Sequence, residues 1–139
     1  MTNYTNNPWI PGVTTDVFVP DQLIAGDLKI VTDSVQIGGS GLYERGTVMG
    51  VIEATGVWIP SVNTATDGSE TPRGVLVDQI DTTTTSPQTG GVYVMAELNF
   101  NSLIYDASWG VAGSAAALNA LKIGFGSTSI FLKTPNSAN

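Results

Sequence analysis

Acidic side chains are the residues of this sequence best suited to catalysis. A glycosidase needs two positioned carboxylates, and two pairs of acids could supply them. They are Asp78 with Asp81, and Glu53 with Glu97. Trp58 or Trp109 could stack on a sugar ring beside either pair. Asp78 and Asp81, however, fall at the end of a predicted strand beside a threonine run, where solvated turn acids are expected. A structural role for these acids is therefore preferred, and a carboxylate hydrolase is the least favoured function.

Other classes of catalytic site lack their characteristic residues. The chain has no Cys and no His, which excludes thiolate nucleophiles, Cys-ligated zinc and the commonest general base. The segment 37–41, IGGSG, lacks the Lys-Ser/Thr ending of a phosphate loop and predicts a turn. Asp67 and Glu70 supply too few oxygens for a calcium loop and predict a second turn. We expect no catalytic residue, no metal ion and no cofactor.

Charge and hydropathy exclude two further classes of partner. Twelve acidic residues against five basic residues give a net charge of -7, so the phosphates of a nucleic acid would repel the chain. No stretch approaches the roughly 18 to 20 apolar residues that span a bilayer, and the first residues carry no export signal. Only 12% of the residues are charged, against roughly 25% in an average domain. That composition suits a chain that hides much of its surface in protein partners.

Residues 1–20 predict a flexible, extended arm. Pro8, Pro11 and Pro20 each push the preceding residue toward extended geometry and remove one backbone donor. The apolar residues of the arm are too scattered to build a core, and we interpret them as anchors for a partner's groove. They are Trp9, Ile10, Val13, Val17, Phe18 and Val19. Among all the aromatic residues, Trp9 and Phe18 are favoured as interfacial because they lie outside the predicted body.

Residues 21–139 predict one β-rich domain. Short runs rich in Val, Ile, Tyr and Thr indicate strands. These runs are residues 28–37, 47–53, 57–59, 73–80, 91–98 and 128–132. The apolar and polar residues alternate imperfectly, which predicts strands that are covered on both faces or crowded in a narrow barrel. Gly50 and Gly74 inside these runs predict bulges or a close approach of the backbone.

One segment predicts a short helix. Ser114 can cap it, Lys122 lies in its last turn and Gly124 follows just beyond its end. Its apolar stripe, centred on Leu118 and Leu121, is expected to plug an open end of the barrel.

The threonine-rich segment 82–87 contains no apolar residue other than its proline and predicts a mobile loop tip.

Three motifs in a fixed order resemble the bacteriophage head decoration proteins of the lambda type. They are GTVMGVIEATGVWIP from Gly46, then DGSETPRGVLVDQID, and, after a threonine-rich spacer, GGVYVMAELNFNSLIY. The resemblance spans roughly Tyr43 to Tyr105. It implies an all-β single domain, a small barrel or β-tulip, with one short helix and an extended N-terminal arm.

The resemblance also implies a function. Members of such a family form homotrimers on the outer capsid surface of the virion. There they bind at three-fold sites and hold neighbouring subunits of the major capsid protein together against the pressure of packaged DNA, after the shell has expanded. The chain would be made in the host cytoplasm, and residues 1–20 would provide the contact with the shell. The main alternative is a glycan-binding β-module on a virion or cell surface, with Trp58 or Trp109 as its stacking platform.

Overall fold

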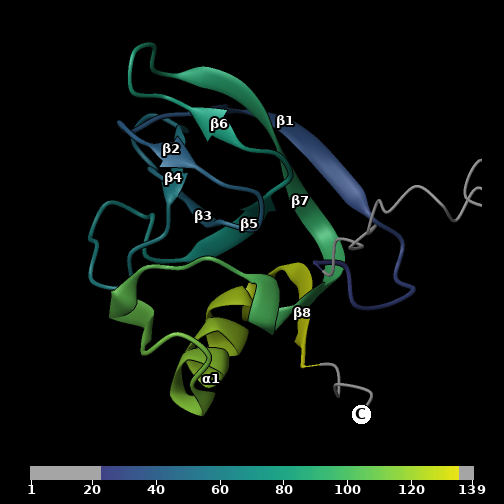
Figure 1. Ribbon diagram of the computed structural model, residues 1–139. Helices are drawn as coiled ribbons and strands as arrows, with labels where there is room; N and C mark the ends of the chain where they lie inside the picture. The colour runs from purple at the N-terminus through teal and green to yellow at the C-terminus, as the bar shows by residue number, and fades with distance from the viewer. Residues whose placement is uncertain (1–22, 135–139) are drawn as a thin grey trace, which may run out of the picture.

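The computed structural model describes residues 23–134, which form eight strands and one α-helix (Figure 1). The strands are β1 Val31–Ile37, β2 Leu42–Tyr43, β3 Val48–Val51, β4 Trp58–Pro60, β5 Pro72–Leu76, β6 Ile80–Asp81, β7 Gln88–Asn99 and β8 Ser129–Lys133. The helix is α1, Ala115–Gly124, and three single turns of 3-10 helix cover Phe100–Ser102, Ala107–Trp109 and Phe125–Ser127. The strand-rich fold with one short helix confirms the predicted fold class.

Five of the strands close into a small barrel. Their order is β1-β4-β3-β5-β7, and β7 pairs back with β1. Most neighbours are antiparallel, whereas β1 and β4 are parallel. β8 lies outside the ring and runs parallel to the second half of β7. β2 and β6 form a separate two-stranded ladder, which the sequence pattern did not predict.

One apolar side chain from each barrel strand fills the lumen. Ile37, Met49, Leu76 and Val92 are fully buried there, and Trp58 of β4 packs against them. Because side chains alternate along a strand, the residues next to these point to the outer face. Val48, Val75 and Tyr93 are such neighbours, and they lie in register across β3, β5 and β7. They belong to a second, larger cluster, the outer cluster, so these three strands are covered on both faces, as predicted.

A single extra residue redirects β7. Thr32 of β1 pairs with Tyr93, but the preceding residue, Val31, pairs with Met95. One residue of β7 therefore has no partner in the β1–β7 ladder. Such a bulge reverses the alternation of side chains. Beyond it, Ala96 and Leu98 are buried in the same outer cluster as Tyr93. The second half of β7 therefore leaves the barrel wall and extends the same sheet to β8.

Both strand glycines occupy positions of close approach, as predicted. A Cβ at Gly50 would lie 2.3 Å from the carbonyl oxygen of Ser69, and one at Gly74 would lie 2.9 Å from the Trp58 ring. The β3–β5 register also shifts between Met49 and Gly50. Glycine is needed at these positions because no side chain fits there.

The helix begins where the sequence predicts. The hydroxyl oxygen of Ser114 accepts a hydrogen bond from the N–H of Ala117. Ala117 and Leu121 are fully buried, but in the outer cluster and not in the lumen, so the predicted barrel plug is wrong. Gly124 is the last residue of α1 and not the residue after it. It packs so closely on Pro72 that a Cβ would lie 2.7 Å from that ring.

Candidate functional site

The candidate carboxylate pairs are not arranged as an acid and a base. The hydroxyl and the backbone N–H of Thr83 donate hydrogen bonds to Asp81 and hold its pKa below the ordinary value of 3.8. A general acid needs the opposite shift. Asp78 is exposed on the loop before β6. The Glu97 carboxylate lies 3.3 Å from the ammonium group of Lys133, while the side chain of Glu53 packs over Gly68. Each acid thus has a separate structural environment.

Both tryptophans proposed as sugar platforms pack against residues of the body. Trp109 is only 5% exposed, and its indole N–H donates a hydrogen bond to the carbonyl oxygen of Ser61 at 3.1 Å. Trp58 packs over Gly74 and against the lumen residues. An exposed ring face is what sugar stacking requires, but Trp109 is buried and Trp58 is half-buried. The geometry therefore does not favour the glycan-binding alternative.

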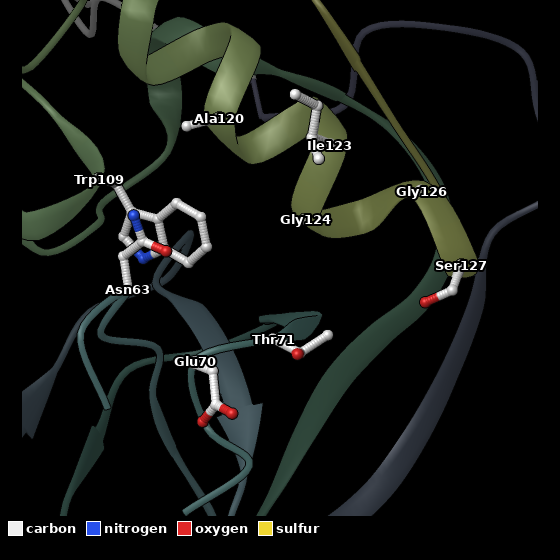
Figure 2. A pocket seen from close by; sticks show the side chains of 9 residues that line it. All are labelled: Asn63, Glu70, Thr71, Trp109, Ala120, Ile123, Gly124, Gly126 and Ser127. Atoms are coloured by element: carbon white, nitrogen blue, oxygen red, sulfur yellow. The ribbon is translucent and has the colours of Figure 1, made fainter. Parts of the chain in front are cut away.

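An open groove of about 620 Å³ lies between α1 and the loops before β5. Figure 2 shows Trp109 and Asn63 on one side, Ile123 and Gly124 on the other, and Glu70 below. Glu70 is the sole titratable residue of the lining, and its carboxylate accepts a hydrogen bond from the N–H of Gly68 at 2.8 Å. That bond closes the predicted turn at residues 67–70 and leaves the groove without an acid–base pair.

The other predicted loops have structural roles. Residues 39–41 form a bend, as predicted for the glycine-rich run. Asp67 accepts hydrogen bonds from the hydroxyl and backbone N–H of Ser69, which lower its pKa and confirm the second turn. Among residues 23–134, no cluster of acidic side chains is placed to hold a metal ion. In the same range no helix is long and apolar enough to cross a membrane.

Thr82 differs from the expectation of a mobile loop tip. It is 1% exposed, and its hydroxyl both donates to the carbonyl oxygen of Gly41 at 3.0 Å and accepts from the N–H of Gly41 at 3.1 Å. These bonds tie the start of the threonine run to the bend before β2. Residues 83–87 are exposed. Residues 82–85 are all threonine, so the sequence pattern does not distinguish the buried Thr82 from its exposed neighbours.

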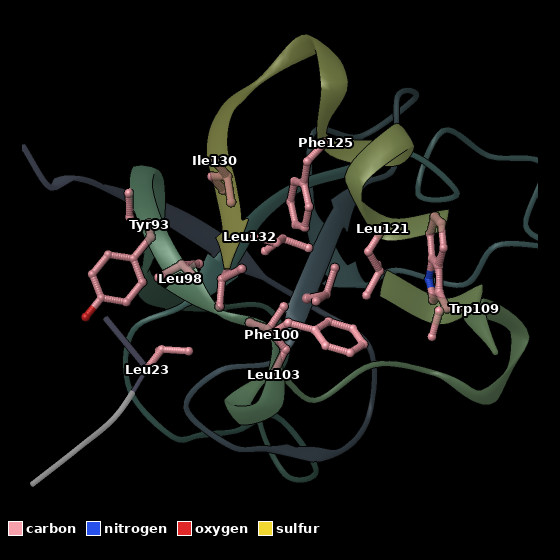
Figure 3. Packing of buried hydrophobic residues seen from close by; sticks show 14 residues of the cluster. Leu23, Tyr93, Leu98, Phe100, Leu103, Trp109, Leu121, Phe125, Ile130 and Leu132 are labelled. Carbon is pink, nitrogen blue, oxygen red and sulfur yellow. The ribbon is translucent and has the colours of Figure 1, made fainter. Parts of the chain in front are cut away.

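The point where the N-terminal segment joins the body is firmly held. Leu23 is 2% exposed in the outer cluster, and Figure 3 shows it beside Tyr93 and Leu103. The N–H of Asn99 donates to the carbonyl oxygen of Leu23 at 2.7 Å, and the N–H of Ala25 donates to the carbonyl oxygen of Glu97 at 2.9 Å. We call residues 23–25 the arm root.

The arm root and β8 flank the same end of β7. Leu23 lies opposite Asn99 on one edge, and Lys133 pairs with Asn99 on the other. Two strand spacings separate the arm root from β8, which is about 10 Å. The sequence pattern did not predict this arrangement. The apolar pair Leu23 and Ile24, which follows the last proline of the arm, was its only signal.

The six residues proposed as anchors all lie outside the described residues. They are Trp9, Ile10, Val13, Val17, Phe18 and Val19. Within the body, large apolar side chains are exposed at other positions. They are Ile30, Val31, Leu42, Ile104, Val111, Ile123 and Phe131. Val31 stands on β1 and Phe131 on β8, which are two of the strands that pair with β7, and Ile30 directly precedes β1.

Comparison with known protein families gives one match. Residues 13–125 match the family described as bacteriophage lambda head decoration protein D. The matched range includes all the barrel strands, the whole of α1 and part of the predicted arm. No curated protein matches the chain.

Proposed function

The chain belongs to the family of bacteriophage lambda head decoration protein D, a family of structural proteins of the phage capsid, and on that premise we propose how it works. The protein forms a homotrimer that binds the outer surface of the shell at three-fold sites. It contacts the major capsid protein through residues 1–20. By bridging neighbouring capsid subunits, it stabilises the shell after DNA packaging and expansion.

The arm root is the observation that carries this proposal. Leu23 and Ala25 are fixed to β7 by packing and by two backbone hydrogen bonds. Residues 1–22 therefore start from a defined place on a rigid body. The proposed anchors Phe18 and Val19 precede Leu23 by five and four residues, which is a reach of roughly 14 to 18 Å. This geometry suits an arm that grips a surface close to the body.

A single arm would bind weakly. Ordering a residue costs about 1 to 2 kcal/mol, so fixing residues 13–20 costs on the order of 8 to 16 kcal/mol. Burying Val13, Val17, Phe18 and Val19 returns about 1.5 to 3 kcal/mol each, which nearly balances that cost. Three arms on one rigid trimer make the second and third contacts intramolecular and raise avidity by roughly a hundredfold or more. Trimerisation and affinity for the shell are thereby coupled.

A variant within the arm tests the proposal. Phe18→Asp should reduce co-sedimentation with expanded shells while leaving the melting transition nearly unchanged, because the residue contacts the shell and not the core. A chain that lacks residues 1–20 should stay folded and lose shell binding. Val111→Asp is the matched control, since Val111 is 78% exposed on the body, and it should bind normally.

Two outcomes contradict the proposal. Full binding by the truncated chain would show that the arm is not the shell contact. Unfolding of the Phe18→Asp chain would place Phe18 in the core. Salt adds a further check, because apolar anchors predict only a modest loss of binding from low to high salt. A steep loss would instead implicate Lys29, Arg45 or Arg73.

A further inference from the structure

The outer edge of β8 carries a hollow that the fold does not fill. The hollow has a volume of about 350 Å³, and its lining includes Ile130, Phe131 and Leu132. Side chains of successive strand residues point to opposite faces. Ile130 and Leu132 are buried in the outer cluster, whereas Phe131 is 53% exposed on the other face. Residues from both faces of β8 line this hollow together with Lys122 and Phe125, so it lies beside the strand, next to the end of α1.

This edge has backbone groups available for pairing. β8 is the last strand of its sheet, and among residues 23–134 it pairs with β7 alone. An edge strand presents alternate N–H and carbonyl groups to which another extended segment can add. β8 is only five residues long and ends in Lys133. A short edge with a terminal charge limits uncontrolled self-association.

The charge around the edge indicates the chemistry of the occupant. Lys122, in the last turn of α1, lines the hollow, and Lys133 stands at the end of β8. These are two of only five basic residues in a chain of net charge -7. Because Glu97 lies 3.3 Å from Lys133, Lys122 supplies the positive charge of this apolar edge. The edge suits an extended segment with alternating apolar side chains and at least one carboxylate.

We propose that the edge of β8 is a second shell contact, at which an extended segment of the major capsid protein adds as a strand. This inference rests on the proposed function, because it takes residues 1–20 to bind the shell. The arm root and β8 lie about 10 Å apart across β7, with Leu23 and Lys133 both opposite Asn99. A shell that the arm grips within five residues of Leu23 also lies beside β8.

The test uses the full chain and Phe131→Lys, which places a charge on the edge. Binding to expanded shells should weaken by at least about tenfold, because roughly 100 Å² of phenylalanine surface would no longer leave water. Phe131→Leu should retain most of the binding. Val111→Lys, at a still more exposed apolar residue before the start of α1, should bind like the unchanged chain. Melting temperature and mass in solution should be the same for all four proteins.

A charge reversal provides a second variant. Lys122→Glu should weaken shell binding severalfold, and Lys122→Arg should restore it. Unchanged binding by both Phe131→Lys and Lys122→Glu overturns the inference. An altered mass in solution for Phe131→Lys also overturns it, because the edge would then join copies of this chain.

Failure of the inference can be distinguished from failure of the proposed function. If the unchanged chain does not bind shells, the proposed function fails and the inference fails with it. If Phe18→Asp abolishes binding while Phe131→Lys binds fully, only the edge contact is wrong.

Discussion

Replacing Leu23 tests whether the arm root holds the N-terminal segment to the body. Leu23→Ala removes a side chain that is 2% exposed in the outer cluster. Leucine-to-alanine changes in a core cost about 2 to 5 kcal/mol, through lost burial and a residual cavity. The arm root lies near the end of the described chain and can detach locally, which limits the loss. We therefore expect the free energy of unfolding to fall by about 2 to 3 kcal/mol.

Thermal and urea denaturation measure this change. For a domain of this size, each kcal/mol corresponds to about 3 to 4 °C in Tm, so the variant should melt about 6 to 12 °C lower. Leu42→Ala is the matched control, because it makes the same change at a leucine that is 55% exposed on β2. The control should lose less than about 1 kcal/mol.

Shell binding gives an independent readout of the same variant. If residues 23–25 detach, the first firmly held strand is β1, and the tether from Phe18 lengthens from five residues to thirteen. The effective concentration of each arm falls with about the −3/2 power of tether length, or roughly fourfold. Equal melting of Leu23→Ala and Leu42→Ala would refute the reasoning, as would unchanged shell binding by a Leu23→Ala chain that melts lower.

Two further predictions concern the body. Thr82→Val removes both hydroxyl bonds to Gly41 and leaves its half-buried N–H without that partner; urea denaturation should show a loss of about 1 to 3 kcal/mol, whereas Thr84→Val, at an exposed position, should be neutral. Acid titration tests the carboxylates Asp67, Asp81 and Asp106, whose pKa values hydrogen bonds from Ser69, Thr83 and Ser108 hold below 3.8. Because a lowered folded-state pKa favours folding above the unfolded value, stability should be constant from pH 7 to 5 and fall below about pH 4. The triple Asp-to-Asn chain should lose less stability over that acid range, and an equal loss would contradict the assignment.

The sequence pattern predicted those parts of the fold that depend on local rules. Ser114 caps α1 because its hydroxyl can reach the N–H of Ala117, which depends only on neighbouring residues. Gly50 and Gly74 marked positions where the backbone is closely approached. The imperfect alternation of apolar and polar residues predicted strands covered on both faces, as Val48, Val75 and Tyr93 on the outer side of the barrel show, but it did not predict the bulge in β7.

The parts that depend on distant contacts could not be predicted. Leu23 belongs to the body because its side chain packs in the same cluster as Tyr93 and its carbonyl oxygen accepts a hydrogen bond from Asn99. Both residues lie some seventy positions away in the chain. Thr82 is buried because Gly41 lies against it, and nothing in a run of four threonines distinguishes it from its neighbours. Phe131 is exposed because of the way β8 pairs with β7. The five residues SIFLK do not by themselves specify that pairing.

The antiparallel course of the arm root along β7 determines how it bears a load. Residues 23–25 run opposite to residues 97–99, so a pull on Leu23 along the strand axis shears this pairing. Under such a shearing force both backbone hydrogen bonds and the buried leucine must yield together, whereas a force across the strands would open them one at a time. The arm root is therefore a joint that resists a pull along β7 better than a pull across it.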